Sequence, residues 1–301
     1  MNVKDVCTKL AVLVLWLLVG MVMQGQSASL TGVGSGFDGC VVHRTSTRMR
    51  DIGGLDRIKR ELYYGMLLPL RYPSVFFGGS RAIAACKGWL FSGPPGVGKT
   101  LLAKAVATET NATFFSVGAS SLESKYYGDT AKLLRSLFAS ARERAPSIVF
   151  FDEIDGLCRT RGELDGCSYG LKTELLQCMD GVESSEKDAV VVVAATNRRE
   201  SLDPALRRRL PMTIEFELPD REERRRILEI TMRDEAEPTR VEDAVLDATE
   251  GYSGSDLASL YRIASNLRFR RQITGVEGGA SNGLVPLSVE DWLQAKRRVL
   301  G

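Results

Sequence analysis

The sequence predicts an α/β fold, in which a parallel β-sheet with helices on both faces is followed by a small helical domain. Two continuous runs of β-branched and aromatic residues, at 147–151 and 189–194, are typical of strands that are buried on both faces. Segments with helical spacing separate the apolar runs, which indicates a doubly wound sheet. No strand pattern recurs after Asp220, and 301 residues are enough for two domains.

The same patterns place the individual elements along the chain. We expect Pro69 to end the first helix and Pro219 to end the last strand, because proline lacks the N–H group that both structures need. In the large domain, helices are expected over 56–68, 101–109 and 131–144, and strands over 89–91, 113–117, 147–151, 189–194 and 214–218. In the small domain, helices are expected over 221–233, 241–250, 254–271 and 289–300.

An unbroken apolar run, Leu10 to Met23, lies near the N-terminus behind Lys4 and Lys9. Its 14 residues are short for a membrane span of about 20 residues. Two interpretations remain open: a secretory signal that is cleaved, or a signal anchor that stays in the membrane.

The chain is therefore divided into four parts. Residues 1–24 form the anchor or signal-like segment, and residues 25–50, which are rich in Gly, Ser and Thr, form a flexible linker. Residues 51–219 form the large α/β domain, and residues 220–301 form a small helical lid with a C-terminal helix. With 40 basic and 38 acidic residues, the net charge of +2 gives no indication of a nucleic-acid partner, and we predict none. The basic run at 221–226 is expected to be a solvated patch.

A glycine-rich segment, Gly93 to Thr100, matches the pattern G-x-x-x-x-G-K-[ST] directly after a strand and before a helix. Glycines allow backbone N–H groups to surround a phosphate, while Lys99 reaches the β- and γ-phosphates and the Thr100 hydroxyl binds Mg²⁺. Because the segment occurs in the strand–loop–helix context that this chemistry needs, it predicts a nucleotide site that uses ATP and Mg²⁺.

Polar residues that follow two other strands complete the predicted site. Asp152 and Glu153 come after the strand at 147–151, at the sheet edge where ligands bind in α/β folds. We expect Asp152 to hold Mg²⁺ through water and Glu153 to act as the general base. Asn197 is expected to orient the attacking water. An arginine within 207–209 is placed so that it can stabilise the transition state in a neighbouring subunit.

These segments resemble the AAA ATPases. GPPGVGKT, FFDEID, AATN, LDPALRRRLP and GYSGSDL occur in the order and spacing of that family, from about residue 50 to the C-terminus. The adjacent pair Arg208-Arg209 is similar to the branch that contains katanin, spastin, the ATPase that disassembles ESCRT polymers, and the mitochondrial outer-membrane extractase.

The resemblance implies roles for individual residues. Arg208 and Arg209 would be the arginine fingers, and the segment 161–169 would supply a second pore loop. A first pore loop that grips polypeptide would comprise Lys125, Tyr126, Tyr127 and Gly128, with Tyr126 in place of the usual tryptophan. The nucleotide would be bound by Asp51, Ile52, Gly53, Gly54, Pro94, Pro95, Gly96, Val97, Gly98, Lys99, Thr100, Leu101, Asp152, Gly254 and Ser255.

The resemblance also implies a homo-hexamer that threads polypeptide through a central pore. Because only an apolar segment and a linker precede Asp51, we expect a dislocase that extracts tail-anchored proteins, with the ATPase in the cytosol. The expected location is the mitochondrial outer membrane, with the peroxisomal or endoplasmic-reticulum membrane as alternatives. Two other functions stay open, a microtubule-severing or ESCRT-type remodeller that a partner recruits, and a structural ring component without hydrolysis.

Overall fold

The structure is a computed structural model of the 301-residue chain. It describes residues 41–43, 45–77, 85–118, 130–157, 166–184, 188–233, 241–274 and 285–299. No helix among these residues combines the length and apolar character needed to cross a membrane. The predicted anchor at 10–23 lies outside the described residues, as does the first pore loop at 125–128.

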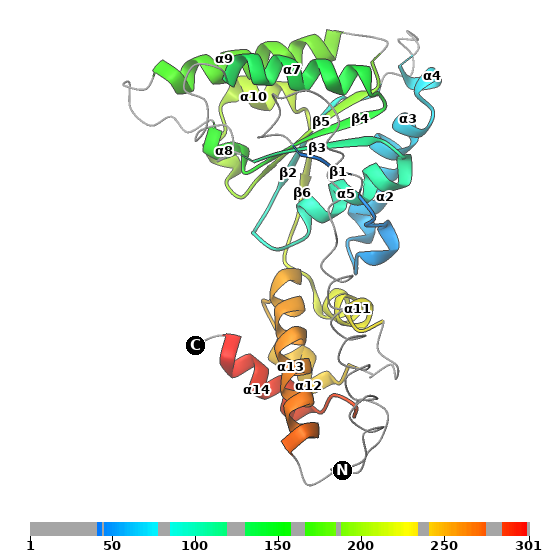
Figure 1. The fold of residues 1–301 in the computed structure, drawn as a ribbon, viewed down its shortest axis with the longest axis vertical. Coiled ribbons are helices and arrows are strands. Elements are labelled where there is room, and N and C mark those ends of the chain that lie inside the picture. The colour runs from blue at the N-terminus through cyan, green and yellow to red at the C-terminus, as the bar shows by residue number, and fades with distance from the viewer. Residues whose placement is uncertain are drawn as a thin grey trace, which may run out of the picture.

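The large domain is built on a sheet with the strand order β1-β3-β4-β5-β2-β6 (Figure 1). Its strands are β1 (Val41–His43), β2 (Gly88–Ser92), β3 (Thr113–Gly118), β4 (Ser147–Asp152), β5 (Val190–Thr196) and β6 (Met212–Glu215). All neighbouring strands are parallel except β1, which pairs with β3 in the antiparallel direction. The predicted parallel sheet is confirmed. The edge strand β1 lies in the segment that the sequence indicated as a linker.

Helices cover both faces of this sheet. The large domain contains α2 (Asp56–Leu62), α3 (Leu68–Arg71), α4 (Pro73–Phe76), α5 (Lys99–Thr110), α7 (Thr130–Glu143), α8 (Ile154–Leu157), α9 (Gly166–Ser184) and α10 (Pro204–Arg209). Figure 1 shows α7, α9 and α10 on one side of the sheet and α2 and α5 on the other. Alternate residues of β4 enter the two cores, since Val149 and Phe151 pack with α7 and α9 and Ile148 and Phe150 pack with α5.

The first helix does not end at Pro69 as predicted. The helical path continues through a π-helical turn, η2 (Tyr63–Leu67), into α3, which carries Pro69 in its first turn. In this turn the N–H of Leu68 donates to the carbonyl of Tyr63, five residues earlier. The hydrogen-bond ladder is thus already shifted at the point where proline lacks a donor, and the chain remains helical up to Arg71.

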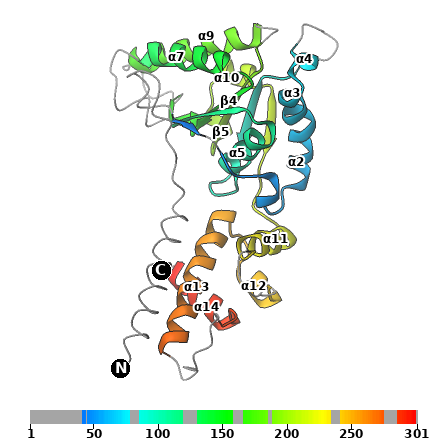
Figure 2. The ribbon, with the colours of Figure 1, turned by 45° about the vertical axis from the view of Figure 1, so that its right-hand side comes forward.

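The lid is a separate helical unit with its own core. It consists of α11 (Arg221–Thr231), α12 (Asp243–Ala248), α13 (Gly254–Thr274) and α14 (Val289–Val299), as predicted in number and order. Buried residues of all four helices form one cluster, in which the rings of Tyr261 and Trp292 lie 6.2 Å apart. Figure 2 shows that α11 and the first turn of α13 face the large domain. These two segments are therefore placed to close over the ends of the strands.

Candidate active site

The glycine-rich loop joins β2 to α5 in a conformation that depends on glycine. Gly93, Gly96 and Gly98 have φ values of 149°, 76° and 98°, which L-residues rarely adopt. A Cβ atom at Gly93 would lie 2.2 Å from the carbonyl oxygen of Phe216. The loop can therefore wrap closely around an anion at the N-terminus of α5, where the free N–H groups favour negative charge.

We expect Gly93→Ala to lower the free energy of unfolding by about 2 kcal/mol or more, because the added methyl group meets backbone and the φ value is strained. Gly170→Ala is the control, since a Cβ atom there meets nothing within 4 Å in the exposed helix α9. The control should match the wild type or gain up to about 1 kcal/mol. Thermal and denaturant unfolding test both variants, and an unchanged midpoint for Gly93→Ala would contradict the expected clash.

Lys99 occupies the centre of the loop and is only 8% exposed. Its Nζ atom donates to the carbonyl oxygens of Gly93 and Pro94, both at 2.7 Å, and to Oδ1 of Asn197 at 2.8 Å. Burial lowers the pKa of Lys99, while the neighbouring carboxylate of Asp152 acts in the opposite direction. The contact with Asn197 brings the ends of β2 and β5 together around one cation.

The ends of two strands also bring together a set of oxygen atoms that suits magnesium. The Thr100 hydroxyl donates to Oδ2 of Asp152 at 3.0 Å. A hydroxyl and a carboxylate are hard oxygen donors, and Mg²⁺ is commonly bound by one or two such groups together with phosphates and water. The arrangement of Thr100 and Asp152 fits that ion beside the loop.

Glu153 has a strained backbone directly after β4. Its φ value of 51° is unusual for a residue other than glycine, and its N–H donates to Oδ1 of Asp152 at 3.1 Å. Strain of this kind is concentrated at functional sites, where the surrounding structure holds it in place. The turn leaves the Glu153 side chain exposed next to the glycine-rich loop, while the next residue, Ile154, is buried.

Buried polar residues support the turn that carries Asn197. The Thr196 hydroxyl donates to Oδ1 of Asp155 at 3.0 Å, and the same hydroxyl oxygen accepts the N–H of Arg198, also at 3.0 Å. Thr196 and Asp155 are 1% and 8% exposed, so this link between β4, β5 and the following turn is shielded from water. Neither supporting residue was predicted from the sequence, because their contact joins positions 41 apart in the chain.

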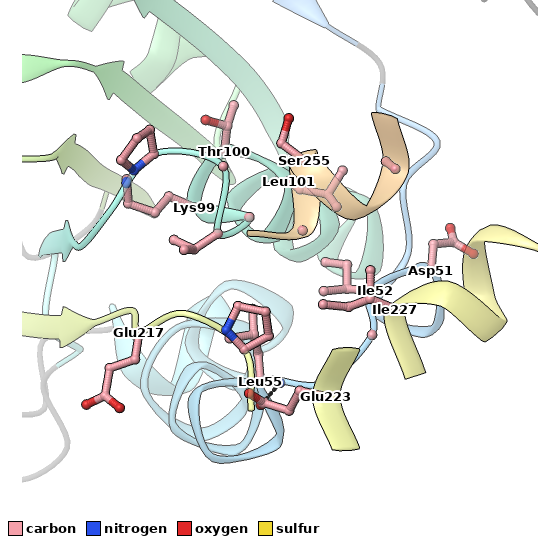
Figure 3. A pocket seen from close by; sticks show the side chains of 18 of the residues that line it. Asp51, Ile52, Leu55, Lys99, Thr100, Leu101, Glu217, Glu223, Ile227 and Ser255 are labelled. Atoms are coloured by element: carbon pink, nitrogen blue, oxygen red, sulfur yellow. Dashed lines mark hydrogen bonds between the residues drawn. The ribbon is translucent and has the colours of Figure 1, made fainter. Parts of the chain in front are cut away.

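A cavity of about 510 Å³ extends from the glycine-rich loop to the lid. Figure 3 shows Lys99, Thr100 and Leu101 on the loop side and Ile52 close to Ile227 on the other side. The lid also contacts the loop directly, since the N–H of Ser255 donates to the carbonyl of Gly96 at 3.1 Å. The cavity lining includes these predicted residues: Asp51, Ile52, Gly53, Pro95, Gly96, Val97, Gly98, Lys99, Thr100, Leu101, Asp152, Glu153, Asn197, Gly254 and Ser255.

Two predicted nucleotide-binding residues lie outside this lining. Gly54 is buried against the side chain of Glu223, and Pro94 contributes its carbonyl oxygen to Lys99. Several lining residues were in turn not predicted from the sequence, and four of them come from α11. The missed residues are Leu55, Glu217, Pro219, Glu223, Ile227, Ile230, Thr231 and Ala258.

Helix α11 contributes to the cavity because it has two packed faces. Arg224 and Leu228 point into the lid, whereas Glu223 and Ile227 line the cavity. The expectation of a solvated basic patch at 221–226 was wrong for Arg224, which is 6% exposed and donates to the carbonyl oxygens of Pro219 and Leu246. The i, i+4 spacing of Glu223 and Ile227 was the available signal for a second face.

The structure separates the two predicted arginine fingers. Neither residue lines the cavity. The guanidinium of Arg209 forms a bidentate pair with Asp180 of α9, at 2.5 and 2.6 Å, and this pairing lowers the pKa of Asp180. Arg208 is exposed, and its side chain makes no hydrogen bond or ion pair within the described part of the chain. Of the two, Arg208 is thus the one free to act outside its own subunit.

Comparison with known proteins gives one family for the large domain. Residues 89–218 match the model of the "ATPase family associated with various cellular activities (AAA)". Over 244 residues, the chain is 44% identical to a katanin p60 ATPase-containing protein of mouse, the A-like 1 form, in a match that covers 78% of this chain and 49% of the mouse protein. Human spastin is 46% identical over 225 residues, which cover 73% of this chain and 36% of spastin.

A solved structure covers both domains. The AAA domain of FIGL-1 in complex with ADP has a TM-score of 0.71 and 34% sequence identity, and the match covers 87% of each chain. By contrast, the chain spans about half the length, or less, of the curated relatives that it matches. The likeness therefore extends over the nucleotide-binding unit and lid.

Proposed function

Because this chain belongs to the AAA ATPase family, in the branch of katanin, spastin and FIGL-1, we propose that it is a hexameric, ATP-driven remodeller of microtubules. Family membership identifies the chain as an ATP hydrolase. Members of the family typically assemble as hexamers. The single observation that supports the proposal most is the similarity to katanin and spastin, which favours the microtubule-severing alternative over extraction of tail-anchored proteins.

We assign the chemistry to residues at the ends of β2, β4 and β5. Lys99 would exchange its bonds to the loop carbonyls for bonds to the β- and γ-phosphates. Glu153 would take a proton from the attacking water as the bond between the γ-phosphorus and the ADP oxygen breaks. Asn197, which already contacts Lys99, would orient that water. A magnesium ion held by Thr100 and Asp152 would offset the negative charge of the phosphates.

We propose that the site is completed by a neighbouring subunit. The cavity is lined by both domains of one chain, and it includes Lys99 and the carboxylates but no arginine. Arg208 lies on α10, away from this cavity, with an exposed side chain. A head-to-tail ring would bring Arg208 of one subunit to the cavity of the next, where its charge would stabilise the transferred phosphoryl group.

The proposed substrate is tested by phosphate release from the purified chain with ATP alone, with microtubules, and with a tail-anchored protein in lipid nanodiscs. We expect microtubules to stimulate hydrolysis several-fold and ATP-dependent severing to be visible by fluorescence microscopy. Stimulation by the tail-anchored protein alone would contradict the proposal and would support the dislocase. That function depends on the apolar segment at 10–23, and its membrane location stays a prediction that carbonate extraction of the full chain tests.

A further inference from the structure

A strained turn forms the edge of the cavity farthest from the phosphate loop. Gly54 and Leu55 adopt consecutive left-handed conformations, with φ values of 66° and 58°. This conformation suits glycine but is rare for leucine. Leu55 is also the N-cap of α2, where its side chain supplies no hydrogen bond. The turn therefore needs a stabilising contact from elsewhere in the structure.

The carboxylate of Glu223, on the lid helix α11, supplies that contact. Its Oε1 atom accepts the N–H of Leu55 at 2.8 Å, across 168 residues of sequence. Its Oε2 atom accepts the N–H of Asp220 at 3.3 Å, as part of the capping box that begins α11. Figure 3 shows the bond between Glu223 and Leu55 at the cavity wall. One carboxylate thus holds the start of the lid and the turn of the large domain together.

The surroundings of this bond explain why it matters more than its neighbours. Two ion pairs, Asp51–Arg233 and Asp56–Arg226, join the same two segments. Both arginines are about half exposed, at 49% and 45%, so water screens these pairs. Glu223 instead forms a charge-assisted bond to a partly buried N–H group, which is a stronger type of interaction.

The turn and helix α11 pack in direct contact at the apolar end of the cavity. A Cβ atom on Gly53 would lie 2.6 Å from the Cα atom of Ile227, so only glycine allows this approach. The cavity lining at this end includes Ile52, Leu55 and Ile227, whereas Lys99 and Thr100 lie at the phosphate end. A flat apolar group such as a nucleobase fits between the two segments that Glu223 joins.

We propose that Glu223 is a positioning residue for the nucleoside part of ATP, because it fixes the turn at Gly54–Leu55 against α11. This inference rests on the ATP site proposed above. Glu223 acts on the base through the turn and leaves the phosphate end unchanged. Its loss separates the two walls of the base site, so that nucleotide affinity falls while the hydrolysis step keeps its geometry.

The test compares Glu223→Ala with Glu223→Gln and with the control Glu222→Ala, whose side chain is 60% exposed and does not line the cavity. We expect KM for ATP to rise roughly tenfold in Glu223→Ala, as for the loss of one charge-assisted hydrogen bond, with kcat within about twofold of wild type. Glu223→Gln keeps one acceptor oxygen and should fall between. The control should match the wild type.

Inorganic tripolyphosphate with Mg²⁺, used as a competitive inhibitor, separates positioning from general damage. It occupies only the phosphate end, so its inhibition constant should be the same for the wild type and Glu223→Ala. An unchanged KM for ATP in a folded variant would overturn the inference, as would an equal loss of affinity for tripolyphosphate. If the wild type itself released no phosphate from ATP, the proposed function would fail instead. Circular dichroism and thermal unfolding establish that each variant is folded.

Discussion

Glu153→Gln is expected to reduce ATP hydrolysis by roughly 100- to 10,000-fold while ATP binding is retained. The substitution keeps the size and shape of the side chain but removes the group that accepts a proton from water. The strained backbone at Glu153, with its φ value of 51°, places this side chain beside Asp152 and the glycine-rich loop. Binding should survive, because Lys99 and Thr100 are unchanged.

Phosphate release and binding of a fluorescent ATP analogue measure the two properties separately. Glu250→Gln is the matched control, since Glu250 is exposed in the lid and lies outside the cavity lining. Its hydrolysis rate should equal that of the wild type. Substantial residual hydrolysis by Glu153→Gln would remove Glu153 from the role of general base. Loss of ATP binding would indicate instead that this carboxylate holds the fold of the site.

Arg208→Ala is expected to reduce hydrolysis by roughly 1,000-fold or more, since an arginine that reaches the transferred phosphoryl group stabilises charge that develops only in the transition state. Arg207→Ala is the control, because Arg207 is also exposed on α10. Arg209→Ala should behave differently, as Arg209 is already paired with Asp180 within its own subunit. We expect it to lower stability by up to about 1 kcal/mol, as for a partly exposed ion pair.

Mixing variants tests whether Arg208 acts on a neighbouring subunit. Arg208→Ala chains keep Glu153, and Glu153→Gln chains keep Arg208. In a mixed ring, about one interface in four would combine an intact Glu153 with an intact Arg208 from the neighbour. The mixture should therefore hydrolyse ATP faster than either variant alone. Two inactive variants whose mixture remains inactive, in rings shown to be mixed, would contradict action between subunits.

Sequence patterns predicted most elements because each depends on local physics. The runs at 147–151 and 189–194 are apolar at every position, or nearly so, and they indicated buried strands, which the structure contains as β4 and β5. The first helix was different. Pro69 indicated an end, but the π-helical turn at Tyr63–Leu67 shifts the hydrogen bonds and allows the helix to continue. Such a shift depends on packing against the sheet and leaves no periodic signal.

The sequence by itself determined the chemistry of the site: the glycine-rich loop, Lys99 and the polar residues that follow β4 and β5. These roles depend on residue type and on the place of each residue at a strand end, which a linear pattern records. Only the tertiary structure decided how Arg208 differs from Arg209 and why Glu223 faces the cavity. Both outcomes depend on partners that are distant in the chain, Asp180 and Leu55, and adjacent residues with the same chemistry differ only in which partner they reach.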